Sequence, residues 1–262
     1  MRVVFFDIDG TLIEHRLGVD AIPASVLEQL ERLHAQGDKL IICSGRPFAM
    51  IDESVALPIF DGFVTFNGGQ VDVEDVTISR TLLGYGLARE VVDLFDELGC
   101  EYVLETAHHV YLNRNFPHIY AFFRQFLPPD FFTFDFDLEE VLTRTIKFEA
   151  AVSGIDYEPT RVAMGERLGS RVTVDEHGTA NSFELYSSAT SKATGIQKVL
   201  EHYGVGPQDA IGIGDGLNDI EMIRFCGTGV AMGNAMDALK AEADLVIGAV
   251  DEDGMARYLR TL

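Results

Sequence analysis

Two aspartates, Asp7 and Asp9, lie two residues apart where a short apolar segment at residues 3–6 gives way to Gly10. An apolar run of this length, rich in β-forming residues, is typical of a strand buried on both faces. The carboxyl end of such a strand is where ligands bind in a parallel α/β sheet. The pattern therefore favours a functional site over a surface turn, which Asp and Gly also form readily.

A second acidic segment, GIGDGLND, occupies residues 212–219 at the end of another predicted strand. Its glycine spacing is loosely similar to a dinucleotide-binding loop, but aspartates inside the loop would repel a pyrophosphate. Carboxylates suit a hard cation, and Mg²⁺ takes carboxylates and waters while a substrate phosphate fills another position. The segment therefore predicts a magnesium site.

Two groups between these segments could bind an anion. Ser44, Gly45 and Arg46 follow the second predicted strand and offer a hydroxyl, a glycine amide and the start of a helix. Lys192 opens a predicted helix shortly before the second acidic segment. A single lysine is usually a solvated surface group, so the candidacy of Lys192 depends on its position.

The overall charge limits the partners of the chain. The 262 residues carry 42 acidic and 20 basic side chains, which gives a formal net charge of −22. Such a surface repels a nucleic-acid backbone, so we expect no nucleic-acid partner. It also repels phosphorylated metabolites, so a phosphate site must gather positive charge locally.

The chain shows no feature of a membrane or secreted protein. No stretch approaches the roughly 20 apolar residues of a membrane span, and the N-terminus lacks the features of a signal peptide. Cys43, Cys100 and Cys226 are far apart and follow no metal-ligand spacing, which predicts reduced thiols. We expect a cytoplasmic protein without a membrane partner, either a monomer or a weak homodimer.

Strands and helices alternate at both ends of the chain. The first part predicts strands at 3–6, 40–43 and 63–66 with helices at 25–36 and 47–57. The last part predicts strands at 210–213, 230–232 and 245–247, with helices between and after them, beginning with one at 191–203. This alternation predicts an α/β fold with a doubly wound, Rossmann-like parallel sheet.

The middle of the chain has a different pattern. Predicted strands occur in pairs and mix with helices, which indicates an inserted α+β domain. The expected strands are 101–105, 110–113, 146–152, 171–175 and 182–186, and the expected helices are 85–98, 116–127 and 160–168. We place the insert at residues 83–187 and the core at 1–82 and 188–262. The phenylalanines between 116 and 136 are expected to form the core of the insert.

The four segments 7–11, 44–46, 192 and 214–219 match, in order, the motifs of the haloacid-dehalogenase-like (HAD) phosphatases. The large insert resembles the cap of the Cof-type branch, as do the segments 67–69 and 230–235. The resemblance implies a phosphatase that hydrolyses small phosphate monoesters, such as sugar phosphates or phosphorylated cofactors, with Mg²⁺ as its cofactor. It also implies that the cap selects the substrate.

The resemblance further implies a role for each motif residue. Asp7 would be the nucleophile that becomes an acyl phosphate, and Asp9 would exchange protons with the leaving group and with water, oriented by Thr11. Mg²⁺ would be held by Asp7, the carbonyl of Asp9 and Asp215, with support from Asn218 and Asp219. Lys192 would act in catalysis, and the substrate phosphate would be bound by Thr11, Ser44, Gly45, Arg46, Lys192 and Asn218.

Two alternatives stay open. A phosphohexomutase would share the four motifs and pass the phosphoryl group to a second hydroxyl. A non-catalytic module responding to metal or phosphate would use acidic strand ends and a lysine without turnover. Within the cap, His108, His109 and Arg114 are candidate substrate contacts near a predicted hairpin tip.

Overall fold

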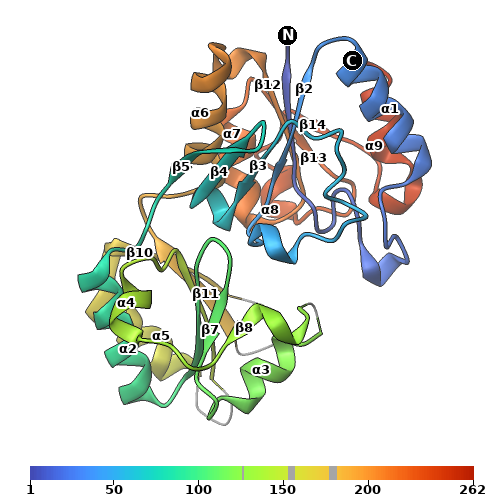
Figure 1. Cartoon of the computed structure of the whole chain (residues 1–262). Helices are drawn as coiled ribbons and strands as arrows, with labels where there is room; N and C mark the ends of the chain where they lie inside the picture. The colour runs from blue at the N-terminus through green and yellow to red at the C-terminus, as the bar shows by residue number, and fades with distance from the viewer. Residues whose placement is uncertain (126, 153–156, 177–181) are drawn as a thin grey trace. The chain divides into compact units, whose positions relative to one another are not determined.

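The computed structural model describes residues 1–125, 127–152, 157–176 and 182–262. They fall into two compact units, each of which can be followed in Figure 1. The core unit contains Met1–Arg46, Ile51–Arg80 and Ser191–Leu262, and the inserted unit contains Pro47–Met50 and Thr81–Thr190. Position 126, which belongs to the predicted phenylalanine cluster, lies outside the described residues.

The core unit is built on an eight-stranded sheet with the order β14-β13-β12-β1-β2-β3-β4-β5. Strands β14 through β3 pair in parallel, and β4 and β5 add an antiparallel hairpin at one edge. The α/β fold class predicted from the sequence is therefore confirmed. The strands are β1 (Val3–Phe6), β2 (Lys39–Cys43), β3 (Gly62–Thr65), β4 (Gln70–Val73), β5 (Val76–Arg80), β12 (Ala210–Gly214), β13 (Thr228–Ala231) and β14 (Leu245–Val246).

Helices cover both faces of this sheet, which explains why its central strands are continuous apolar runs. Successive side chains of β1 point to opposite faces. Val4 and Phe6 join a hydrophobic cluster with helices α1 and α9, whereas Val3 and Phe5 join one with α6 and α7. The helices are α1 (Ala24–Ala35), α6 (Lys192–Tyr203), α7 (Ile220–Phe225), α8 (Asp237–Lys240) and α9 (Gly254–Leu259).

One local prediction was wrong, and one hairpin was not predicted. The helix expected at 47–57 is replaced by a single 3-10 turn at Phe48–Met50, and the Asp52 carboxylate accepts a bond from the Ser54 amide at 2.7 Å. Such side-chain bonds to the local backbone compete with helix formation. The hairpin of β4 and β5 was not expected, because its turn places Glu74 and Asp75 at positive φ instead of the usual Asn or Gly.

The inserted unit contains a six-stranded sheet with the order β10-β11-β9-β6-β7-β8, antiparallel except between β7 and β8. Its strands are β6 (Glu101–Glu105), β7 (Val110–Leu112), β8 (Phe132–Thr133), β9 (Lys147–Ala151), β10 (Val172–Glu176) and β11 (Ser182–Ser187). Its helices are α2 (Tyr85–Leu98), α3 (Pro117–Phe123), α4 (Leu138–Leu142) and α5 (Tyr157–Leu168). The structure thus contains the paired strands and mixed helices that the sequence predicts.

The two faces of this sheet bury different parts of the unit. Tyr102 and Leu104 of β6 pack in a cluster with α2, whereas Val103 between them packs with Phe123 of α3 and with Phe132. The predicted phenylalanine core is therefore present in part. Phe134 and Phe136 are only half-buried.

The three cysteines agree with the expectation of reduced thiols. Cys43, Cys100 and Cys226 are free and buried. Burial raises the pKa of Cys226 to about 12, which makes that thiol unreactive near neutral pH. Within the part of the chain that the structure describes, no helix is both long and apolar enough to span a bilayer.

Candidate active site

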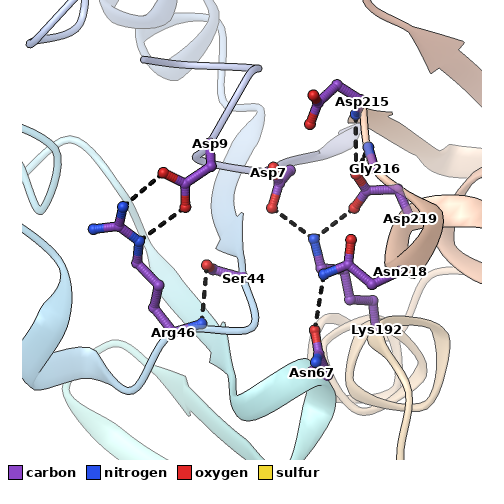
Figure 2. Close-up of polar contacts among 10 residues, drawn as sticks. All are labelled: Asp7, Asp9, Ser44, Arg46, Asn67, Lys192, Asp215, Gly216, Asn218 and Asp219. Carbon is purple, nitrogen blue, oxygen red and sulfur yellow. Dashed lines mark hydrogen bonds and ion pairs between the residues drawn. The ribbon is translucent and has the colours of Figure 1, made fainter. Parts of the chain in front are cut away.

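Asp7 lies at the carboxyl end of β1, in the middle of the core sheet. Its amide donates to the carbonyl of Ile213 at 3.0 Å, which ties the residue to the end of β12. Its side chain is buried, and one carboxylate oxygen accepts a hydrogen bond from Lys192 Nζ at 2.6 Å (Figure 2). Asp7 is thus a carboxylate held rigidly at the edge where parallel sheets bind ligands.

Lys192 is the first residue of α6, where Ser191 caps the helix with a hydroxyl that accepts from the Thr194 amide. Its fully buried ammonium also donates to Asp219 at 2.5 Å, so it lies between two carboxylates. Burial alone would lower the pKa of Lys192, but the charges of Asp219 and Asp7 raise it overall. The sequence position that suggested this lysine therefore corresponds to a buried, charged group.

Asp219 organises the second acidic segment. Its Oδ2 atom accepts hydrogen bonds from the amides of Asp215 and Gly216, both at 2.9 Å (Figure 2). Gly214 provides the space for this carboxyl, because a Cβ at position 214 would lie 2.4 Å from it. The glycines of this loop thus serve close packing around an aspartate.

Asp7, Asp215 and Asp219 form a cluster suited to a cation. Each offers a carboxylate oxygen, and these atoms lie within 4.8 Å of one another. Burial, followed by the charge of Asp219, raises the pKa of Asp215 to about 7, and burial with neighbouring carboxylates also raises the pKa of Asp7. Three carboxylates and one ammonium leave two negative charges, so the cluster fits a divalent ion with oxygen ligands.

Asp9 lies beside this cluster and is more accessible. Its side chain is 55% exposed, and both carboxylate oxygens accept from the guanidinium of Arg46, at 2.8 Å from Nε and 2.6 Å from Nη2 (Figure 2). A two-bond contact of this kind fixes the direction of a carboxylate. Arg46 was expected among the phosphate-binding groups, and the structure places its guanidinium on Asp9.

Ser44 and Gly45 follow β2, next to Asn67. The buried Ser44 hydroxyl accepts from the Arg46 amide at 3.2 Å. A Cβ at Gly45 would lie 3.0 Å from the Asn67 amide group, and that same group accepts from Asn218 Nδ2 at 3.1 Å. The turn after β2 and the second acidic segment therefore meet through Asn67.

Sequence reasoning missed Asn67 as a site residue. It is buried, with a left-handed backbone at φ 51°, and it positions Asn218. The available signal was the Asn-Gly-Gly string at 67–69, which entered only as a mark of resemblance. Asn234 was missed in the same way, and its amide donates to the Gly10 carbonyl at 2.7 Å.

The remaining predicted residues have less direct contacts. Thr11 is buried, and its hydroxyl makes no hydrogen bond to the described part of the chain. In the inserted unit, His108 and His109 lie exposed in the turn between β6 and β7. Arg114 pairs with Asp135 at 2.9 Å.

Comparison with known proteins agrees with this architecture. The profile of the haloacid dehalogenase-like hydrolases matches residues 4–259. The putative phosphatase YkrA of Bacillus subtilis is 31% identical over 266 residues, covering 100% of this chain and 97% of that protein. The 5-amino-6-(5-phospho-D-ribitylamino)uracil phosphatase YitU of the same organism is 29% identical over 98% of this chain and 96% of that protein.

A solved structure gives the same result. The HAD subclass IIB sugar phosphatase BT4131 superposes with a TM-score of 0.83 at 26% identity, covering 100% of this chain and 98% of that one. The resemblance inferred from four short motifs is therefore confirmed over the whole chain, together with the enzyme class, a hydrolase of the HAD phosphatase type. The chain belongs to the haloacid dehalogenase-like hydrolase family.

Proposed function

We propose that this protein is a magnesium-dependent phosphatase that hydrolyses small phosphate monoesters through a phosphorylated Asp7. The observation that carries the proposal is the buried Lys192 ammonium between Asp7 and Asp219, next to Asp215. This arrangement places a cation-binding set at the ends of β1 and β12. A divalent cation bound there would, together with Lys192, supply the local positive charge that a phosphate site needs in a chain of net charge −22.

Asp7 is the proposed nucleophile. Its carboxylate oxygen forms a bond to phosphorus while the ester oxygen of the substrate leaves, which produces an acyl phosphate. Asp7, Asp215 and the Asp9 carbonyl, with Asp219 in support, would hold Mg²⁺, whose charge would offset the repulsion between phosphate and carboxylates. Lys192 holds Asp7 in place and contributes the remaining positive charge.

Asp9 is the proposed proton carrier. It gives a proton to the leaving oxygen in the first step, and it takes a proton from the water that cleaves the acyl phosphate in the second step. Its exposure suits contact with a substrate and with water. The two hydrogen bonds from the Arg46 guanidinium fix the direction of the Asp9 carboxylate. We therefore assign Arg46 a positioning role in addition to the phosphate-binding role expected from the sequence.

We propose that groups at the ends of β2 and β12 bind the oxygens of the substrate phosphate. Ser44 supplies a hydroxyl and Gly45 a backbone amide after β2, while Asn218 supplies an amide from the second acidic segment. Asn67 supports this set because it bonds Asn218 and packs against Gly45. Thr11 remains a candidate for the same set because its buried hydroxyl has no partner among the described residues.

The relatives suggest which substrates to test. YitU is named for a phosphoribitylamino-uracil and BT4131 for sugar phosphates, and both kinds of substrate are small phosphate monoesters. We propose a substrate from this class, with residues 83–187 acting as a cap that selects it. We also propose a cytoplasmic location and a monomeric or weakly dimeric state.

Phosphate release from a panel of these compounds tests the proposal. We expect release to require Mg²⁺, to stop with a chelator and to fall at least about 10⁴-fold in Asp7→Asn, because the nucleophile is lost. Circular dichroism of Asp7→Asn verifies that the variant is folded. Release that continues in this variant would contradict the assignment of Asp7, and isomerised sugar phosphate without free phosphate would identify a mutase.

A further inference from the structure

The inserted unit contains a cavity of about 330 Å³ that no step of the proposed reaction uses. All of its lining residues belong to that unit. Its apolar wall is formed by Tyr102, Leu104, Phe134, Phe136 and Leu138. The volume is within the range of small-molecule sites, which is about 300–1,000 Å³, and such sites combine apolar walls with a few polar groups.

The aromatic walls are held in place by contacts outside the cavity. The Tyr102 ring packs against Phe95 with centroids 5.5 Å apart, and its hydroxyl donates to Asp96 at 3.0 Å. Phe136 packs edge-on against Tyr111 at 5.3 Å. Because these rings are fixed by other partners, a ligand does not have to order them, which favours binding.

Arg114 and Asn113 are the polar residues of the lining. The Arg114 guanidinium lies 4.7 Å from the centre of the Phe134 ring and pairs with Asp135 at 2.9 Å. The Arg114 and Asp135 side chains are 62% and 88% exposed, so water screens their attraction. An anionic ligand can therefore replace Asp135 on the guanidinium at little cost.

We propose that this cavity binds a small planar aromatic acid. The ring of such a ligand lies against the aromatic walls, and its carboxylate or other acidic group bonds to Arg114. Aromatic rings pack well on one another, and a guanidinium bonds a carboxylate with two parallel hydrogen bonds. Arg114 is the cationic residue of the lining, and it becomes available to an anionic ligand when the ligand replaces Asp135, in a chain whose net charge of −22 otherwise repels anions.

Isothermal titration of the full-length protein with 2-naphthoate and with the uncharged 2-naphthamide tests the proposal. We expect 2-naphthoate to bind with a Kd of about 1 mM or tighter, and 2-naphthamide to bind about tenfold more weakly. In Arg114→Gln the affinity for 2-naphthoate falls about tenfold, and the two compounds bind alike. Neither probe contains phosphate, so the result does not depend on catalysis.

Two further variants locate the binding. Arg144→Gln is a matched control, because Arg144 also faces a ring, that of Tyr111 at 5.4 Å, and pairs with Glu140 at 3.3 Å, but it does not line the cavity. It should bind both probes like the wild type. Leu138→Trp fills the cavity and should remove binding of both.

Three results would overturn the proposal. The first is no saturable heat with either probe well above about 1 mM, and the second is equal binding of both probes by the wild type. The third is unchanged binding of 2-naphthoate in both Arg114→Gln and a folded Leu138→Trp. Arg114 is exposed, so we expect Arg114→Gln to fold even if Leu138→Trp does not.

Discussion

At the scale of single residues, the chemistry of this protein depends on which charged groups touch. Lys192 lies between Asp7 and Asp219 with distances of 2.6 and 2.5 Å, and all three side chains are buried. Removing one partner of a buried ion pair leaves an uncompensated charge, which typically costs about 3–5 kcal/mol of stability. Substitutions of Lys192 would therefore combine loss of its proposed catalytic role with structural effects, whereas the more exposed pair of Arg46 and Asp9 allows tests with a smaller structural effect.

Arg46→Gln tests whether Arg46 positions Asp9 or binds the substrate phosphate. We expect kcat to fall about tenfold while KM changes less than about threefold, because the Asp9 carboxylate loses the two hydrogen bonds that orient it. The kcat of Arg46→Lys should lie between those of the wild type and Arg46→Gln, since lysine retains the charge but cannot form both hydrogen bonds to Asp9. Steady-state kinetics with Mg²⁺ in excess measures both parameters.

The double variant provides the control for this prediction. Asp9→Asn alone should lower kcat by about 10²–10⁴-fold, and adding Arg46→Gln should slow it no further, because both changes affect one proton carrier. A higher KM with unchanged kcat in Arg46→Gln would instead favour the phosphate-binding role.

At the scale of elements, the loop after β1 and the loop after β12 approach so closely that a side chain at Gly10 would meet Asp215. Gly10 has φ +72°, and a Cβ there would lie 2.1 Å from Asp215 Oδ2. Gly18, in the same connection before α1, has φ +74° but open space around it. Both glycines therefore have a left-handed backbone conformation that other residues rarely adopt, but only Gly10 lacks the space for a side chain.

Alanine at each position separates these two effects. Both Gly10→Ala and Gly18→Ala should lose about 1–2 kcal/mol of unfolding free energy from the left-handed backbone. Gly10→Ala should in addition lose activity and the stabilisation by Mg²⁺, because its methyl group displaces Asp215. Denaturant unfolding with and without Mg²⁺ measures how much Mg²⁺ stabilises each variant. Equal stabilisation of both variants would contradict the close approach of position 10 to Asp215.

Arg2 and Asp38 join the starts of β1 and β2. The Asp38 carboxylate accepts a hydrogen bond from the Arg2 amide at 2.9 Å and another from Arg2 Nε at 3.0 Å. Burial would raise the pKa of Asp38, but the hydrogen bonds and charge of Arg2 hold it below its ordinary value. The folded state therefore favours the ionised carboxylate. This stabilisation is present above the unfolded pKa of about 3.9 and is lost as pH falls through the lower folded value.

Asp38→Asn should thus destabilise the protein by about 1–3 kcal/mol at neutral pH. The difference from the wild type should stay constant down to about pH 5 and shrink at lower pH. Urea unfolding of both proteins across this range measures the difference. If the difference in unfolding free energy does not shrink at low pH, the charge of Asp38 is not the cause of the difference.

At the scale of the whole molecule, the excess of acidic groups should make the stability of the fold depend on a bound cation. The cluster of Asp7, Asp215 and Asp219 carries more negative charge than Lys192 offsets. Because the pKa of Asp215 is raised to about 7, the folded magnesium-free protein binds a proton that the unfolded chain releases near pH 4. The stability of the magnesium-free protein should therefore fall as pH rises from about 4 to about 7.

Mg²⁺ should reverse this loss. At about 100 times its Kd a ligand adds about 2.7 kcal/mol, which corresponds to a rise in Tm of roughly 5–10 °C for a chain of this size. The rise should be larger at about pH 8 than at about pH 6, because Mg²⁺ must displace the Asp215 proton at the lower pH. Thermal unfolding with Mg²⁺ and with chelator measures it, and an equal rise in Asp215→Asn would place the ion elsewhere.

Much of this organisation could be predicted from the sequence, because the signals are local. Short apolar runs such as residues 3–6 mark strands buried on both faces, and polar residues directly after them mark the ligand-binding edge of the sheet. Asp7 and Asp215 were predicted in this way, whereas Lys192 was predicted from its position at the start of a helix before the second acidic segment. The helix expected at 47–57 failed because the bond between Asp52 and the Ser54 amide is a local competitor that periodicity does not reveal.

Local patterns in the sequence predict the order of most strands and helices and the residue types that follow the strands. Which of these residues come into contact depends on the tertiary structure. Arg46 bonds Asp9 across 37 positions, Asn218 bonds Asn67 across 151, and Lys192 bonds Asp7 across 185. Such pairs depend on how parallel strands line up at one edge and how closely the loops between them pack, and neither is encoded within a local stretch of chain.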